Sequence, residues 1–198
     1  ITKDPKSQEL TIAQADLVVN LAKVKTHGMP TLSAGMKNLF GCVPGLQKPE
    51  LHYRYPNQQA FAGMLVDLDE LVAPAVTVLD GIVAMEGNGP SSGTPTPMNV
   101  LLFSDDAVAL DSVFAALVHV PPAAVPTCVA GAAAGVGEMD LEQSRGLTPG
   151  GEISVAQAVE TYGRSDFDVD RSGETHGRIE RLARLLPLVQ TRPQVDRK

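Results

Sequence analysis

The sequence is poor in several residue types, and each shortage excludes a class of protein. It contains no tryptophan, only 4% aromatic residues, and two distant cysteines, Cys42 and Cys128. Because neither cysteine belongs to a Cys-x-x-Cys pair, the chain has no ligand set for a four-cysteine iron–sulfur cluster or structural zinc ion. No apolar run reaches the ~20 residues that a membrane-spanning helix needs. We therefore expect neither a bound cluster nor a membrane partner.

Positive charge is also scarce, with 16 Lys and Arg against 23 Asp and Glu and a formal net charge of −7. A nucleic-acid partner is not expected, since phosphate binding needs clustered cations. Few cysteines and a polar start without a signal-peptide pattern favour a cytoplasmic protein. The length of 198 residues predicts one domain over 1–190, with a disordered tail at 191–198. The missing initial Met indicates a fragment.

The cations that are present gather behind the apolar run at 17–22. This group comprises Lys23, Lys25, His27 and Lys37, together with the neighbouring hydroxyl of Thr26 and amide of Asn38. Lys23, Lys25 and His27 alternate along an extended segment, so they project to one face. Since the ends of strands in open α/β sheets commonly bind ligands, this group predicts a site for an anionic or carboxylate-bearing small molecule. A solvated strand end is the alternative.

Lys48 and His52 follow in a segment rich in Pro, His and Tyr, 44–56, which we expect to be an ordered loop over the surface. They are candidate ligand-binding residues, and an exposed loop without function is an equal alternative. His27 and His52 lack an obvious third ligand at helical or strand spacing. No metal ligand is therefore predicted, although metal binding stays open as an alternative.

Acidic and amide residues follow the next strands. Asp80 closes an apolar run, Glu86 and Asn88 lie in the glycine-rich stretch 84–95, and Asp106 precedes a helix. Ordinary turn chemistry explains Asp80-Gly81 equally well, and capping is the favoured interpretation of Asp106. The glycine-rich stretch 84–95 is expected to lack regular structure, and it matches no nucleotide-binding fingerprint.

Asp111 lies on an otherwise apolar helix face. A carboxylate there must be paired or hydrogen-bonded, or have a raised pKa. A lysine of the opening group is the expected partner, and a buried ion pair without chemical role is the alternative.

Strand and helix patterns alternate along the chain, which predicts an α/β fold: a mostly parallel or mixed β-sheet flanked by helices in a single domain. The apolar period after Asn57 predicts an amphipathic helix that ends at Pro74. The other predicted strands are 17–22, 75–83, 98–103 and 153–155; the other helices are 31–40, 107–118, 123–134 and 178–188, with 156–162 open between strand and helix and 163–177 irregular.

Several motifs in this order resemble the DUF362 family, a domain of unknown function sometimes found in iron–sulfur proteins. They are Asp16 with 23–27, Gly35-Met36-Lys37-Asn38-Leu39-Phe40-Gly41, Lys48, His52, Asp80-Gly81, 85–90 with Gly93 and Pro95, and Asp105, Asp106 and Asp111. The resemblance covers about 16–137. Family members usually carry a further α/β stretch before this region, which implies an N-terminal truncation. Some relatives append a ferredoxin-like domain, which implies a possible acidic protein partner.

Together these features predict an enzyme domain whose lysines bind an anionic substrate, although the reaction is left open. The lysines are expected to form a mixed-charge cluster with Asp80, Glu86 and Asp111. In it, Lys25 or His27 would act as acid or base, with Glu86 or Asp111 tuning its pKa. The candidate ligand-binding residues are Lys23, Thr26, Lys37, Asn38, Lys48, His52, Asp80, Asn88 and Asp106. The alternatives are a non-catalytic module that docks a ferredoxin-like partner, and a metal-binding domain.

Overall fold

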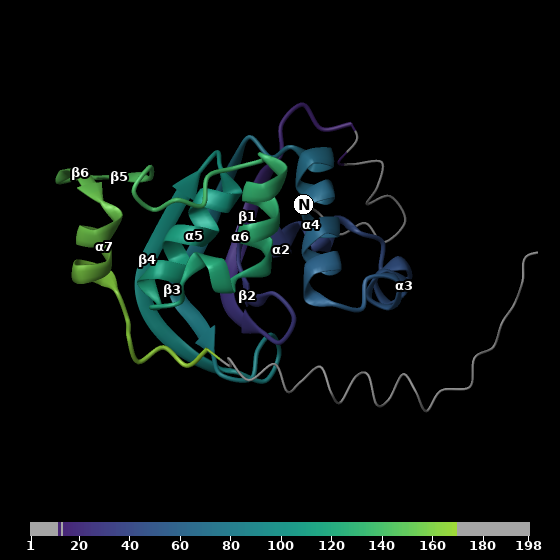
Figure 1. Ribbon diagram of the computed structural model, residues 1–198, viewed down its shortest axis with the longest axis horizontal. Helices are drawn as coiled ribbons and strands as arrows, with labels where there is room; N and C mark the ends of the chain where they lie inside the picture. Colours follow the sequence, from purple (N-terminus) through teal and green to yellow (C-terminus); the bar gives the residue numbers. More distant parts are fainter. Residues whose placement is uncertain (1–11, 13, 170–198) are drawn as a thin grey trace, which may run out of the picture.

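The computed structural model describes residue 12 and residues 14–169, and Figure 1 shows their arrangement. Four strands form a mixed sheet in the order β2-β1-β3-β4, and β5 pairs with β6 in a separate ribbon. The strands are β1 (Val19–His27), β2 (Thr31–Ser33), β3 (Val76–Glu86), β4 (Thr94–Ser104), β5 (Arg145–Thr148) and β6 (Gly151–Ser154). The helices are α2 (Gly35–Asn38), α3 (Gln47–Arg54), α4 (Gln58–Val72), α5 (Ala107–Leu117), α6 (Pro126–Ala134) and α7 (Val155–Tyr162), with 3-10 turns η1 (Leu39–Cys42) and η2 (Pro122–Ala124). The predicted α/β class is confirmed.

Strand β1 is central to the arrangement of the polar groups. It pairs in parallel with β3 along one edge, and its register shifts between Lys23 and Lys25. On its other edge, β2 pairs with only the last three residues, from Lys25 to His27. Helix α2, which follows β2 directly, lies beside the earlier part of that edge.

The helices lie on one face of the sheet (Figure 1). Alternate residues of the strands point toward them, such as Val24 of β1, Leu79 of β3 and Val100 of β4, and are buried together with Phe114 of α5. A second, smaller apolar cluster forms between η1 and α4 around Phe61. Burial of alternating strand residues under amphipathic helices is the main stabilising contribution in such a layered fold.

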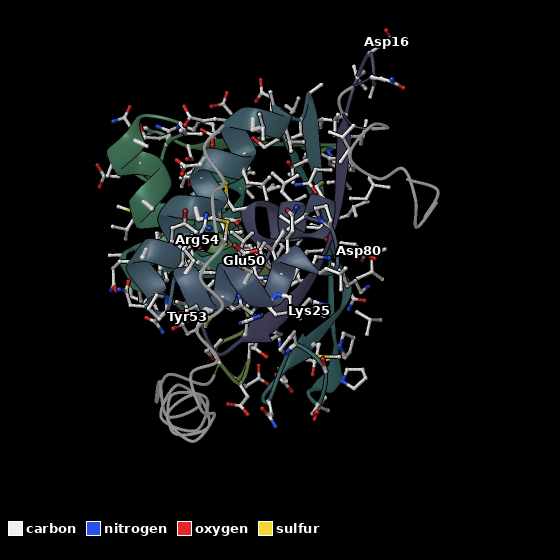
Figure 2. The ribbon with its side chains drawn as sticks, turned by 90° about the vertical axis from the view of Figure 1, so that its right-hand side faces the viewer. Asp16, Lys25, Glu50, Tyr53, Arg54 and Asp80 are labelled. Carbon is white, nitrogen blue, oxygen red and sulfur yellow. The ribbon has the colours of Figure 1, made fainter. Side chains whose placement is uncertain are left out.

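The opposite face of the sheet is open in the described part of the chain, as the turned view of Figure 2 shows. It exposes apolar side chains: Leu21 is 69% accessible and Phe103 is 63% accessible. Both flank Val78 in the register. We expected the apolar run 17–22 to be a buried strand. A strand does form, but only its alternate residues are buried because a single layer of helices covers the sheet.

Most of the predicted elements are confirmed. The amphipathic period after Asn57 corresponds to α4, and the Asn57 side chain accepts a hydrogen bond from the Ala60 amide as its N-cap. Strand β3 is central, between β1 and β4. Helices α5, α6 and α7 lie where helical patterns were found, and strand β6 covers most of 153–155. None of the helices in the described part of the chain has the length and hydrophobicity to cross a membrane.

Three local predictions are wrong. The expected helix over 31–40 is instead strand β2 followed by short α2, and Thr31 has a positive φ of 67° where a helix would begin. The expected surface loop 44–56 contains helix α3. The glycine-rich stretch 84–95 is shorter than expected, because β3 and β4 extend into it. The predicted helix 178–188 and tail 191–198, and part of 163–177, lie outside the described residues.

Candidate functional site

Helix α2 is held at its start by a carboxylate from another helix. Asp111 of α5 is 3% exposed and accepts hydrogen bonds from the backbone N–H groups of Gly35 (2.7 Å) and Met36 (3.1 Å). These amides begin a helix that has no side-chain cap of its own. A Cβ on Gly35 would lie 2.8 Å from the Thr77 methyl and 3.0 Å from Asp111, so this approach needs glycine.

The environment of Asp111 shifts its titration. Burial raises its pKa to about 7, even though the two amide hydrogen bonds favour the charged form. We expected a lysine of the opening group as its partner. Backbone amides take that role, and among the described residues no ion pair involves Asp111. Asp111 therefore contributes to the site by fixing the start of α2.

A pair of asparagines fixes the end of α2 to the free edge of β1. Asn38 donates from Nδ2 to Asn20 Oδ1 (2.7 Å) and to the Leu21 carbonyl (3.0 Å). Asn20 in turn donates to the Gly35 carbonyl (2.9 Å) and to Thr77 Oγ1 (3.3 Å). Sequence reasoning missed Asn20, although an amide within an apolar strand run is a usable signal, because a buried amide needs partners.

These contacts shape a cavity of about 260 Å³ between β1, α2, η1 and α3. Its lining is mainly cationic and polar: Lys23, Lys25, His27, Ser33, Ala34, Lys37, Asn38, Phe40, Gly41, Lys48 and Pro90. Six of the residues singled out in the sequence therefore come together here. In the view of Figure 2, Lys25 lies between Asp80 of β3 and the residues labelled on α3. Ser33 and Phe40 join the wall without having been assigned a role.

The lysines of the cavity differ in their partners. Lys23 forms an ion pair with Asp80 at 2.9 Å, and this contact lowers the pKa of the Asp80 carboxyl. Both side chains are about half exposed, so the pair contributes little stability. Lys25, Lys37 and Lys48 take part in none of the ion pairs found among the described residues. Three lysines thus line one cavity that has no carboxylate among its described lining residues.

Lys37 is the most perturbed of these groups. Its Nζ lies 4.6 Å from the centre of the Phe40 ring and 5.8 Å from that of Phe61. Burial, and then the charges of Lys25 and Lys48, lower its pKa to about 8. The aromatic faces recover part of the lost hydration through cation–π attraction.

Of the two candidate histidines, His27 and His52, only one lines the cavity. His27 lines the cavity, and its Nδ1 accepts a hydrogen bond from the Met29 amide at 3.0 Å. His52 does not line it. Its ring stacks on Phe40 at 5.2 Å and lies 4.8 Å from Phe61, while burial and then Lys37 lower its pKa. In the described part of the chain, no group of three His, Cys, Asp or Glu side chains is placed to hold a metal.

The glycine-rich turn after β3 is tied to β1 by Thr26. The Thr26 hydroxyl donates to the Gly87 carbonyl (2.7 Å) and accepts from the Gly89 amide (3.2 Å). A Cβ on Gly89 would collide with the Thr26 backbone. Thr26 is buried and forms no part of the cavity lining. It instead places the turn whose next residue, Pro90, forms part of the wall.

The remaining acidic candidates lie apart from the cavity lining. Glu86 accepts a hydrogen bond from the Asp168 amide at 3.0 Å. Asp106 caps α5 through the Ala109 amide and accepts from the Glu138 amide, both at 2.8 Å. Asn88 is exposed, outside the lining. The expected mixed-charge cluster of lysines with Asp80, Glu86 and Asp111 is therefore reduced to the single Lys23–Asp80 pair.

Comparisons with known proteins show the family to which the chain belongs. The family model described as "Domain of unknown function (DUF362)" matches residues 8–116. The thylakoid-associated protein sll1697 of Synechocystis sp. is 44% identical over 117 residues, which cover 59% of this chain and 36% of that protein. The chain thus spans about a third of the length of this curated relative. No solved structure matches.

Proposed function

We propose that this chain, which belongs to the DUF362 family of domains of unknown function, binds an anionic small molecule in the cavity between β1, α2 and α3. The observation that carries the proposal is the convergence of Lys25, Lys37 and Lys48 on one cavity without a carboxylate partner among the described residues. Like charges at close range repel each other, and an anion between them removes that repulsion.

The dimensions of the cavity favour a small ligand. About 260 Å³ is below the ~300–1,000 Å³ of sites for drug-sized molecules. Ser33 and His27 add hydrogen-bonding groups to the wall, and the Phe40 ring adds an apolar surface. A short carboxylate or a phosphate therefore suits the site better than a polyanion or a nucleotide.

The state of Lys37 predicts how binding depends on pH. A bound anion stabilises its ammonium form and raises the pKa from the value of about 8. Binding near pH 8 should therefore take up protons, and affinity should fall as the pH rises through that region, because the unbound amine becomes neutral. Isothermal titration calorimetry in two buffers of different ionisation enthalpy measures the proton uptake directly.

Two residues of helix α3 provide a matched test. Lys48 lines the cavity, whereas Arg54 is exposed and pairs with Glu50 on the same helix. We expect Lys48→Met to weaken binding of inorganic phosphate or succinate by about tenfold or more, because a loss of about 1.4 kcal/mol is modest for a charge at contact distance. Arg54→Met removes the same charge and should change affinity by less than about twofold.

The measurements are calorimetry and thermal shift at constant ionic strength. Equal effects of Lys48→Met and Arg54→Met would reduce the interaction to general charge attraction and overturn the proposal. If no small anion binds the wild type, and an acidic ferredoxin-like protein binds with steep salt dependence, the docking alternative replaces it.

A further inference from the structure

Lys37 differs from the other lysines of the cavity in how firmly it is held and in what surrounds its amine. It lies on α2, whose start is fixed by Asp111 and whose end is fixed by Asn38. Its Nζ lies over the rings of Phe40 and Phe61, and burial removes part of its hydration. A lysine amine that is desolvated and lies beside other cations has the environment of an activated nucleophile.

We propose that Lys37 forms an imine with a small ligand that carries both a carbonyl group and an anion, such as a 2-oxo carboxylate. The inference rests on the proposed function, since Lys25 and Lys48 would hold the anionic group beside the amine. It adds a reaction class to a site otherwise described only as a binding cavity.

The step is balanced without an oxidant or reductant. The lone pair of the neutral Lys37 amine attacks the carbonyl carbon, and the π electrons move to the carbonyl oxygen, which takes a proton. The carbinolamine then loses this oxygen as water, so that amine and carbonyl give imine and water. His27 lines the same cavity and is a candidate to move a proton between nitrogen and oxygen.

The titration of Lys37 supports this chemistry. With a pKa of about 8, about a tenth of its amine is neutral at pH 7. An ordinary lysine has less than about a thousandth of its amine in that form. Lys25 and Lys48 therefore have two effects: they attract the anion, and they help to keep the attacking amine unprotonated.

Reductive trapping tests the proposal. The protein is incubated near neutral pH with glyoxylate and sodium cyanoborohydride, which converts an imine into a stable secondary amine that peptide mass spectrometry locates. We expect Lys37 to be labelled about tenfold faster or more than any other lysine. Propanal, an aldehyde without charge, should label it more slowly than glyoxylate, and inorganic phosphate should protect it. The rate should rise with pH to a half-maximum near pH 8.

Two variants complete the test. Lys37→Arg keeps the charge but cannot form an imine, so the preferential label should disappear while phosphate binding stays measurable. Arg54→Lys adds an exposed amine on α3, which should be labelled only slowly. Labelling spread evenly over the lysines, or centred on Lys25 or Lys48, would overturn the inference. If Lys37→Arg does not fold, the pH dependence of the labelling rate in the wild type tests the inference instead.

The two proposals fail in different ways. If phosphate raises the melting temperature of the wild type but glyoxylate does not label Lys37 preferentially, only the imine inference falls. If no small anion stabilises or binds the wild type, the proposed function falls, and the imine inference falls with it.

Discussion

Replacing Asp111 by asparagine isolates the energetic effect of one buried carboxyl beneath the site. Asparagine has nearly the same shape and keeps one oxygen that can accept from the Gly35 amide. Its NH2 group cannot accept from the Met36 amide as the carboxylate does. Asp111→Asn therefore removes the titrating group at the cost of one hydrogen bond, and the difference between the two proteins reports how the carboxyl titrates.

The sign of the pH effect follows from burial. The pKa of Asp111 is raised from 3.8 to about 7, so the folded protein holds this proton over a range in which the unfolded chain has lost it. Stability from this group therefore falls as pH rises from about 4 to 7 and is level above that. Between pH 5 and pH 7.5, the wild type should lose about 2.5 kcal/mol of unfolding free energy relative to Asp111→Asn.

Urea denaturation of both proteins at a series of pH values measures this difference, because other titrating groups are common to both and cancel. A relative loss confined to about pH 4–7 would support the assigned environment. A wild type that gains stability over Asp111→Asn as the pH rises would refute it. In that case the amides of Gly35 and Met36 stabilise the carboxylate more than burial opposes it.

Three further substitutions test a helix cap, the glycine-rich turn and an exposed ion pair. Asn57→Ala removes the N-cap of α4 and should reduce the unfolding free energy by about 1 kcal/mol in chemical denaturation. Gly89→Ala places a methyl group against the Thr26 backbone and should lower both the melting temperature and phosphate affinity, since the adjoining turn forms part of the wall. Lys23→Ala breaks an exposed pair with Asp80 and should change stability by less than about 1 kcal/mol; a larger loss in denaturation would show a structural role.

The parts of the fold that were predictable have strong periodicity. Helix α4 buries Phe61, Met64 and Leu65 on one side, so its apolar spacing indicates both its existence and its orientation. Helix α3 is only 8 residues long and has no fully buried residue, so its sequence offers too few apolar positions to indicate a helix. At 31–40, the pairing of Thr31 with His27 overrides a helical pattern that looks plausible locally. Tertiary pairing of this kind is not visible in a single sequence.

The site was predictable where it depends on one strand. Lys23, Lys25 and His27 share a face of β1 because strand residues alternate, and all three line the cavity. The acidic residues depend on where other elements turn after the strands end. Glu86 is directed to the Asp168 amide, and Asp111 lies beneath α2. Sequence spacing gives no information about either direction.

The placement of Asp111 gives a physical reason why the cationic cavity persists in a chain of net charge −7. If Asp111 paired directly with Lys37, the ammonium would be neutralised and the cavity would have little attraction for an anion. Instead, Asp111 accepts hydrogen bonds from the amides of Gly35 and Met36. These bonds position the helix that carries Lys37. Helix α2 is thus held in place while the charge of Lys37 is not neutralised by Asp111. If the cavity binds an anion as proposed, Lys37 can take part without first having to break an internal ion pair.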